Sequence, residues 1–407
     1  MKFVIGFFLL STGAFAQVLP HLDLEMSSNE YRTYFKTHNL KIRASDPESI
    51  QVALRLGERL SNWIEAENKN RPSINALRLT SPGTRTGIPI DKAKIYSDKT
   101  VDAEMKTLLV DMPDAMKSVI LSTDDFPVKL PVSDEIFINL GRRLDKIYQT
   151  SARYKALIPN RAQYEVLAQL DVRGYYFLNI NKWDATKLSD VSVISADDAI
   201  KVKAALVGIC VNNNVVEVKC QKQVEDAWGK NNIAALYTNW ITASAKIWNN
   251  FFNIKPWSVR HDIDYRDANV MNVPFNTPSI SKFKAYLKDN LEDEWKFNTW
   301  NLRIIFGDYS NGPELIFQTG VVPHVNVLGG SRIVMDSNQS IEEYESQWTI
   351  RHEFGHVLGL PDCYHEFYDS TLQAFVNYQL DITDLMCSRA GNMNERLYKE
   401  LTKTYHH

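Results

Sequence analysis

Apolar residues recur at helical spacing through most of the first 250 residues of the chain. Segments 46–67 and 133–157 begin with residues that cap helices, and their apolar side chains fall three and four positions apart. A third segment of this kind, 224–252, contains three tryptophans and predicts one further long helix. We therefore expect residues 17–253 to form a mainly helical N-terminal region.

The pattern changes after residue 253. Short apolar runs and alternating segments predict β-strands at 258–265, 301–308, 313–320 and 331–338. Helical spacing returns at 278–295, 340–359 and 392–407. Ser340 and Glu343 stand three residues apart, as in the capping box that opens many helices. Strands combined with helices in this order predict an α+β domain over residues 254–407.

The composition is that of an ordinary globular protein, and the charge balance argues against nucleic acid as a partner. The 407 residues include 46 basic and 49 acidic side chains, a net charge of −3, so no positive field attracts phosphate backbones. Residues 1–16 hold one lysine, an apolar run too short to span a bilayer and a small-residue site ending at Ala16. This arrangement is typical of a cleavable signal peptide. We expect a secreted or periplasmic protein without stable membrane insertion.

An oxidising compartment changes the interpretation of the four cysteines, because an even number of cysteines there favours disulfides. Cys210 and Cys220 flank an asparagine-rich segment that predicts a hairpin turn with the cysteines at its base. Cys363 and Cys387 would then pair by elimination. Free buried thiols are the alternative.

Residues 348–369 hold the densest group of chemically active side chains. His352 and His356 stand four residues apart on one predicted helix, so both rings project from the same face and can meet at one metal ion. Glu353 is displaced around the helix, where its carboxylate can reach a metal-bound water. The surrounding residues are apolar, and a buried helix does not tolerate such polar groups without partners. The segment therefore predicts a catalytic zinc site.

The residues after this helix supply a third ligand. Gly359 favours the left-handed conformation that ends helices, and Pro361 prevents the helix from resuming. The turn can return Asp362 to the metal, which leaves a fourth position open for water. His365 is the alternative third ligand, and Glu366 is also within reach along the chain. We favour Asp362.

The stretch HEFGHVLGLPD resembles the extended H-E-x-x-H-x-x-G-x-x-H motif of the metzincin metalloproteases. It departs from that motif at the last position, where Asp362 replaces a histidine, and in this it resembles the snapalysin-type branch with an aspartate as third zinc ligand. The resemblance implies a catalytic role for Tyr364, two residues further on. It also implies a methionine turn beneath the metal at Met386. It covers roughly residues 257–407.

The resemblance carries further expectations about the C-terminal domain. It implies a metzincin-like fold with a twisted mixed sheet, a metal-binding helix, the methionine turn and a final helix. It also implies an exposed edge strand above the cleft that pairs with an extended substrate, for which residues 330–338 are the candidate. If Met386 lies beneath the metal, Cys363 and Cys387 follow the third ligand and the methionine directly and would be close enough for a bridge.

The activity implied is that of a zinc metalloendopeptidase. Zn²⁺ would activate a water, Glu353 would accept its proton, and Tyr364 would help to stabilise the oxyanion of a protein or peptide substrate. A zinc amidase acting on cell-wall peptides would use the same site. An inactive zinc-containing binding or adhesion protein is an alternative of another class, against which the intact Glu353 argues. Residues 17–253 are either a removed inhibitory pro-region or a permanent accessory domain, and the sequence leaves both open.

Overall fold

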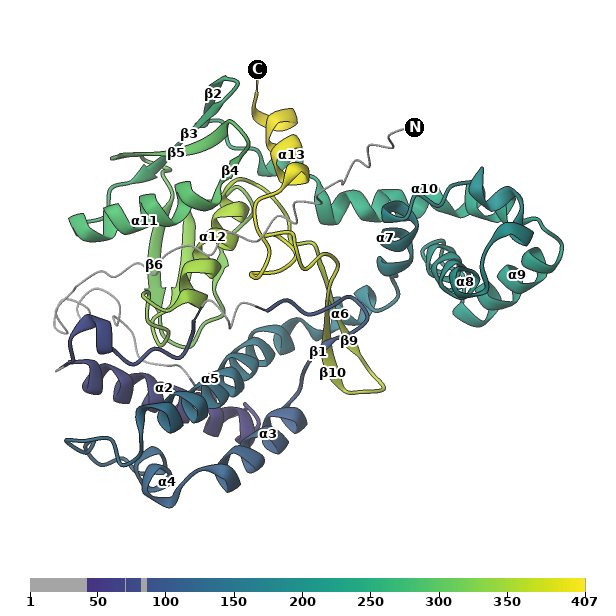
Figure 1. The fold of residues 1–407 in the computed structure, drawn as a ribbon. Helices are drawn as coiled ribbons and strands as arrows, with labels where there is room; N and C mark the ends of the chain where they lie inside the picture. The colour runs from purple at the N-terminus through teal and green to yellow at the C-terminus, as the bar shows by residue number, and fades with distance from the viewer. Residues whose placement is uncertain (1–41, 70, 82–85, 407) are drawn as a thin grey trace, which may run out of the picture.

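The computed structural model describes residues 42–69, 71–81 and 86–406 (Figure 1). The expected signal peptide, residues 1–16, lies outside the described residues. Within the described part of the chain, no helix combines the length and the apolar character needed to cross a membrane.

Four helices form the first helical layer, drawn in purple and blue in Figure 1. They are α2 (Glu48–Asn68), α3 (Asp98–Asp111), α4 (Asp114–Leu121) and α5 (Asp134–Leu157). The helices predicted at 46–67 and 133–157 are confirmed as α2 and α5. The hydroxyl of Ser133 accepts a hydrogen bond from the Ile136 amide and so caps α5. Gly57 lets α2 approach α5 closely, because a Cβ there would lie 2.3 Å from the ring of Tyr148.

The short helix α6 (Arg161–Leu167) follows α5 and lies against β9 (Tyr364–Asp369), and the next helices form an arm on the other side of the molecule (Figure 1). The helices of the arm are α7 (Arg173–Ile180), α8 (Ala196–Val211), α9 (Glu217–Gly229) and α10 (Ile233–Phe252). The single helix predicted over 224–252 is wrong, because the chain breaks between α9 and α10. Asn231 there adopts a left-handed conformation with φ of 51°, and its side chain accepts a hydrogen bond from the Val191 amide. The Cys210–Cys220 disulfide is present and ties α8 to α9, with the asparagine-rich turn between two helices.

The C-terminal half contains two small sheets and three helices. The first sheet has the order β2-β3-β5-β4, from β2 (Asp264–Asp267), β3 (Val270–Asn276), β4 (Lys296–Phe297) and β5 (Trp300–Gly307). The second has the order β6-β8-β7, from β6 (Glu314–Gln318), β7 (His324–Val325) and β8 (Arg332–Asp336). The helices are α11 (Ser281–Glu294), α12 (Tyr344–Val357) and α13 (Glu395–Tyr405). Both sheets mix parallel and antiparallel pairs, which confirms the α+β class, but the strands form two sheets in place of the one expected.

Three expectations for this half need correction. The strand predicted at 258–265 is displaced, since β2 begins only at Asp264. The expected exposed edge strand at 330–338 is wrong, because β8 pairs with β6 on one side and β7 on the other and is buried over four of its five residues. The capping box is wrong as well: α12 begins at Tyr344, and the Glu343 carboxylate accepts hydrogen bonds from Leu79 and Thr80 of the N-terminal region instead.

A third sheet joins the two halves of the chain, and the sequence pattern did not predict it. Its order is β1-β10-β9, from β1 (Lys94–Tyr96), β9 (Tyr364–Asp369) and β10 (Ala374–Gln379). In Figure 1 the β9–β10 hairpin extends from the C-terminal half toward α5 and α6. Tyr368 and Phe375 on this hairpin are buried in the same hydrophobic core as α2, α3 and α5. The N-terminal region and the C-terminal half therefore share both a sheet and a core.

Candidate metal centre

The helix α12 is buried all round. Every residue from Ser346 to Val357 is buried, although several carry polar or charged side chains. The guanidinium of Arg351 is fully buried and donates to the Asn290 side chain at 2.8 Å and to the Glu294 carboxylate at 3.0 Å, both on α11. Pairing of this kind offsets the cost of burying a charge. It fixes the side of α12 that packs on α11.

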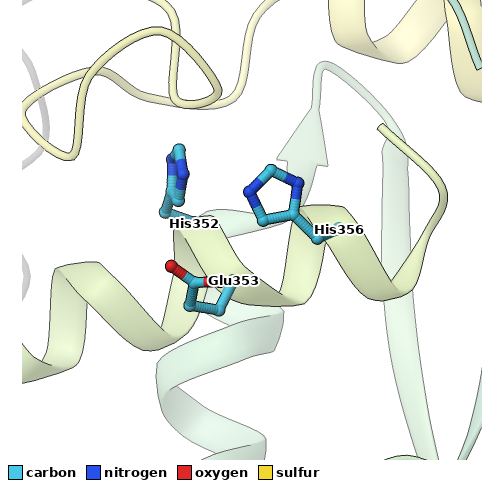
Figure 2. A group of neighbouring side chains, drawn as sticks. All are labelled: His352, Glu353 and His356. Atoms are coloured by element: carbon cyan, nitrogen blue, oxygen red, sulfur yellow. The ribbon is translucent and has the colours of Figure 1, made fainter. Parts of the chain in front are cut away.

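His352 and His356 project from the same face of α12, as their spacing predicts (Figure 2). The Nδ1 atom of each ring has a backbone carbonyl as its partner: Leu385 for His352 at 2.7 Å, and Leu360 for His356 at 2.8 Å. A carbonyl accepts only, so Nδ1 carries a proton in both rings and Nε2 is the nitrogen left to bind a metal. Metal-binding histidines are commonly oriented in this way.

The turn after α12 returns the chain to the histidines. Gly359 has a φ of 80°, and a Cβ at this position would lie 2.6 Å from the carbonyl oxygen of Ser258. The Gly359 amide donates to His356 and the Leu360 amide donates to Gly355, each at 3.0 Å. These two bonds form a Schellman motif, which closes a helix and reverses the chain. The sequence prediction of a glycine turn here is confirmed.

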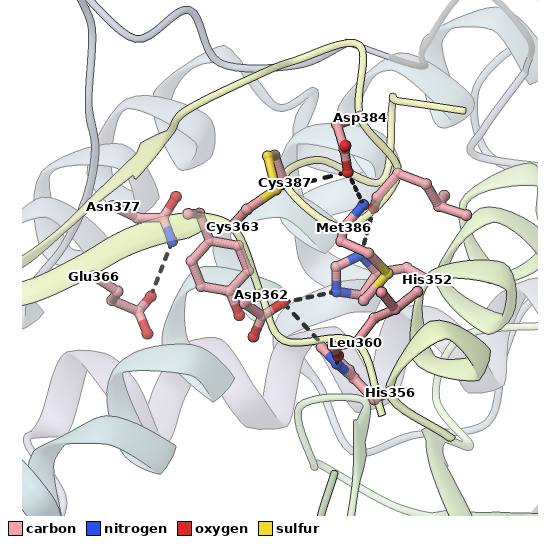
Figure 3. A network of polar contacts seen from close by, with 12 residues as sticks. His352, His356, Leu360, Asp362, Cys363, Glu366, Asn377, Asp384, Met386 and Cys387 are labelled. Atoms are coloured by element: carbon pink, nitrogen blue, oxygen red, sulfur yellow. Dashed lines mark hydrogen bonds and ion pairs between the residues drawn. A yellow bond between two sulfur atoms is a disulfide. The ribbon is translucent and has the colours of Figure 1, made fainter. Parts of the chain in front are cut away.

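This reversal places Asp362 between the two rings (Figure 3). Its Oδ1 lies 3.0 Å from Nε2 of His352 and 3.2 Å from Nε2 of His356. Donor atoms of a tetrahedral zinc site, with bonds of about 2.0–2.1 Å, are roughly 3.3 Å apart. The three predicted ligands thus converge with a spacing that fits zinc.

The same convergence explains the charge states of these groups. Burial acts to raise the pKa of Asp362, but His356 and His352 hold it below its ordinary value. Burial acts to lower the pKa of His356, yet the carboxylates of Asp362 and Glu353 outweigh burial and raise it to about 9. The site therefore stabilises positive charge between the rings.

Glu353 follows His352 on α12, and its side chain lies beside the His352 ring (Figure 2). It is buried, and its ligand atom lies within 4.8 Å of those of His352 and His356. Its Oε2 atom has no hydrogen-bond partner among the described residues. Buried carboxylate oxygens are nearly always satisfied, so this atom points to a missing partner such as a bound water.

Met386 packs directly beneath this arrangement. A Cβ on Gly355 would lie 2.2 Å from the sulfur of Met386, which places the thioether against the turn of α12 between the two histidines. The Cys363–Cys387 disulfide is present with a Cα–Cα distance of 4.3 Å, and the Cys363 amide also donates to the Met386 carbonyl at 3.1 Å. The bridge ties the segment after Asp362 to the segment after Met386, as the resemblance implied.

Asp384 lies near the same two sulfur atoms, but this group does not form a second metal site. Both sulfurs are used in the disulfide. The Asp384 carboxylate instead accepts hydrogen bonds from the Met386 amide at 2.9 Å, from Asn394 at 2.8 Å and from Arg396 at 2.7 Å. It holds the methionine turn in place.

Tyr364 lies at the start of β9, and its hydroxyl contacts a residue that sequence analysis missed. Arg153 on α5 donates through Nη2 to the Tyr364 oxygen at 3.1 Å and to Glu366 at 2.7 Å, and through Nε to Glu366 at 3.1 Å. Burial raises the pKa of Tyr364 well above its ordinary value, and Asp362 adds to that effect, while Arg153 opposes it. The phenol is therefore protonated. Nothing in the local sequence around Arg153 indicates this contact.

His365 does not join the metal centre. Successive side chains of a strand point to opposite faces, so Tyr364 and Glu366 share one face of β9 and His365 points to the other. There it packs against Phe251 and Phe367, with ring centroids 6.0 and 4.9 Å away. The alternative third ligand is thus placed away from His352 and His356.

A cavity of about 670 Å³, the central cavity, opens beside the candidate metal centre. Its described lining includes His352, Glu353 and Tyr364 from the C-terminal half. The N-terminal region contributes much of the remaining lining, including Lys94, Tyr96, Asp145 and Arg153. No family model, curated protein or solved structure matches this chain. Function therefore has to be inferred from the site itself.

Proposed function

We propose that this protein is a zinc-dependent metallopeptidase that hydrolyses peptide bonds within proteins or peptides. The observation that carries the proposal is the convergence of His352, His356 and Asp362, with donor atoms 3.0 and 3.2 Å apart. The two histidines and one carboxylate are a ligand set of catalytic zinc sites, in which a fourth position stays open. The central cavity beside them gives a substrate access.

Zinc, when bound, polarises a water and lowers its pKa to about 7. The residues of the chain then divide the remaining work. Glu353 has a buried oxygen that no described residue contacts by a hydrogen bond, and it would accept the proton of the attacking water. The same carboxyl would later donate that proton to the leaving amine. His352 and His356 are held by backbone carbonyls and need not reorient.

Tyr364 would donate a hydrogen bond to the carbonyl oxygen that gains negative charge. The Tyr364 oxygen accepts from Arg153, and its own proton, which faces the Asp362 carboxylate in this structure, would turn to the substrate once Asp362 binds the metal. Arg153 is anchored by Glu366 through two hydrogen bonds and is thereby a positioning residue for Tyr364. This arrangement supports a role for the N-terminal region in the active enzyme.

The setting of the protein is part of the proposal. Two disulfides, Cys210–Cys220 and Cys363–Cys387, suit an oxidising compartment, in keeping with the export expected from residues 1–16. A zinc amidase acting on cell-wall peptides would use the same residues. A panel of protein and cell-wall peptide substrates separates the two activities.

The decisive variant is Glu353→Gln. The amide has nearly the shape of the carboxylate but cannot accept a proton from water. We expect proteolysis of a casein-type substrate to fall by at least about a hundredfold, in the range measured for general-base catalysis. Zinc content, measured by metal analysis of the folded protein, is expected to remain at one per chain because Glu353 is not a ligand.

The matched control is Glu395→Gln, an exposed carboxylate at the start of α13. It should leave both hydrolysis and zinc content unchanged. Hydrolysis that survives in Glu353→Gln, or that resists a chelator in the wild type, contradicts the proposed mechanism. A folded wild type without stoichiometric zinc contradicts the metal centre itself.

A further inference from the structure

One face of the third sheet forms a continuous row of polar side chains in the central cavity. Lys94 on β1 pairs with Asn377 on β10, and Asn377 pairs with Glu366 on β9. Cross-strand partners point to the same face of a sheet. Tyr364 and Tyr96 lie two residues away on the same face, and all but Glu366 line the cavity directly. The row therefore runs from Lys94 to the residues beside the metal centre.

The cations in and beside this row differ in whether a carboxylate pairs with them. Arg153 forms an ion pair with Glu366 at 2.7 Å, and Arg389 forms one with Glu345 at 3.0 Å. Lys94 forms no ion pair with a carboxylate anywhere in the described ranges of the chain. Its ammonium group lies 5.2 Å from the centre of the Tyr96 ring, a favourable but weak contact.

The surroundings of Lys94 are unfavourable for a lone cation. Burial, and then the neighbouring charges of Arg389 and Arg153, lower its pKa to about 8, while Glu345 and Glu104 act in the opposite direction. An ammonium group in such a place gains more from an arriving anion than an exposed one would. The anion would restore the partner that the fold does not supply.

We propose that Lys94 forms the cationic end of a substrate subsite that selects an acidic group on the peptide. The inference rests on the proposed function, because it names the substrate class of the same cleft. The group recognised is a carboxylate, either an Asp or Glu side chain or the free C-terminus of a peptide. Lys94 is a specificity-determining residue of the N-terminal region.

The position of this subsite follows from the geometry of the sheet. Neighbouring strands are about 4.8 Å apart, so Lys94 lies roughly 10 Å across the sheet from Glu366, and a little further from Tyr364. An extended peptide advances about 3.3 Å per residue. The acidic group should therefore stand about three residues from the scissile bond.

The experiment measures binding, so that it does not depend on turnover. The Glu353→Gln protein, loaded with zinc, is titrated with three fluorescent peptides. They differ only in carrying Glu, Gln or Lys at the position about three residues from the scissile bond. We expect the Glu peptide to bind about tenfold or more tightly than the Gln peptide, the effect of one charge-assisted hydrogen bond. Lys94→Glu in the same background should reverse the order and favour the Lys peptide.

Two variants keep the result interpretable. Lys94→Met removes the charge while keeping much of the length, and it should abolish the preference without reversing it. Lys129→Glu changes the net charge by the same amount as Lys94→Glu, at an exposed position away from the cavity, and it should leave the preference intact. Equal binding of all three peptides to the parent protein together with equal binding of a free C-terminus and its amide, or an unchanged preference in both Lys94 variants, overturns the proposal.

A second pair of peptides distinguishes the source of the carboxylate. One carries a free C-terminus and no acidic side chain, and the other is its C-terminal amide. Preference for the free C-terminus identifies terminal carboxylate recognition, whereas equal binding of this pair together with selection of the Glu peptide identifies the side chain. Failure of the hydrolysis test with Glu353→Gln would overturn the proposed activity alone, because selective binding is measured separately.

Discussion

At the scale of single residues, the fold raises the pKa of Asp145 on α5 above the ordinary value of an aspartate. Its carboxyl lies at the wall of the central cavity near Glu345, and it accepts a hydrogen bond from Gln149 at 2.7 Å. Burial, and then the charge of Glu345, raise its pKa to about 7, with Glu343 adding to the effect and hydrogen bonds from Gln149 and Gln339 opposing it. In the unfolded chain an aspartate releases its proton near pH 3.9. The folded state thus retains a proton that the unfolded state has lost.

The sign of the pH dependence follows from this difference. Between about pH 4 and pH 7 the unfolded state binds fewer protons, so the free energy of unfolding falls as the pH rises. We predict that Asp145→Asn reduces this fall between about pH 4 and pH 7, as measured by urea denaturation at each pH. Asp125→Asn, at an exposed position, should keep the slope of the wild type. Identical slopes in Asp145→Asn and the wild type would show that Asp145 titrates normally.

The residues of the candidate metal centre were predictable from the sequence to different degrees. His352, Glu353 and His356 follow from helical spacing alone, because their relation depends on one local element. Asp362 needed only the glycine turn. Arg153 and Lys94 were not predictable, since each reaches the cavity through a contact with strands that lie far away in the sequence.

At the scale of elements, the packing of α12 on the methionine turn fixes the position of the two histidines relative to Met386. Gly355 leaves room for Met386, whose sulfur would lie 2.2 Å from an added Cβ. Both sides of this contact are fully buried, so the sulfur has little space to retreat. A single methyl group at Gly355 should therefore push α12 and the methionine turn apart.

We predict that Gly355→Ala lowers the free energy of unfolding by about 1–2 kcal/mol, since overpacking costs about 1–3 kcal/mol and the helix gains up to about 1 kcal/mol from alanine. Zinc affinity should fall as well. Gly229→Ala on α9 is the control, because a Cβ there meets nothing within 4 Å. That variant should be neutral or slightly more stable. Chemical denaturation of both variants checks the prediction. If Gly355→Ala were as stable as the wild type, the packing described would be contradicted.

The long helices could be predicted because their apolar spacing is regular over 20 residues or more, as in α2 and α5. The β9–β10 hairpin could not. Its strands are six residues each, and β10 is buried on four consecutive positions, so it shows no clean alternation. The third strand of this sheet, β1, lies in the N-terminal region, and no local pattern specifies its pairing with β10.

For the molecule as a whole, the contact of Arg153 with Tyr364 and Glu366 links the helical layer to the proposed catalytic centre. We predict that Arg153→Met lowers kcat about tenfold or more with a smaller change in KM, because Tyr364 loses its orientation. Zinc content should be unchanged. Arg153→Lys keeps the charge and should restore part of the rate. Steady-state kinetics on one peptide substrate measure both parameters.

Arg143→Met is the matched control for the whole-molecule prediction. It removes an arginine of the same helix, whose ion pair with Asp111 at 2.8 Å is exposed. It should change neither kcat nor KM. If Arg153→Met also kept the kcat of the wild type, the N-terminal region would have no part in positioning Tyr364.

The contacts between the halves also have a consequence for the order of events during synthesis. The Leu79 amide bonds to Glu343, 264 residues later in the chain, and β1 pairs with a strand of similar separation. Pairings of such long range form late, because they need the largest loss of chain freedom. The first helical layer lacks Phe375 and Tyr368 from its core until synthesis has passed residue 375. The cleft wall that carries Arg153 and Lys94 is therefore assembled last, and a nascent chain carries its histidines before it has a working pocket.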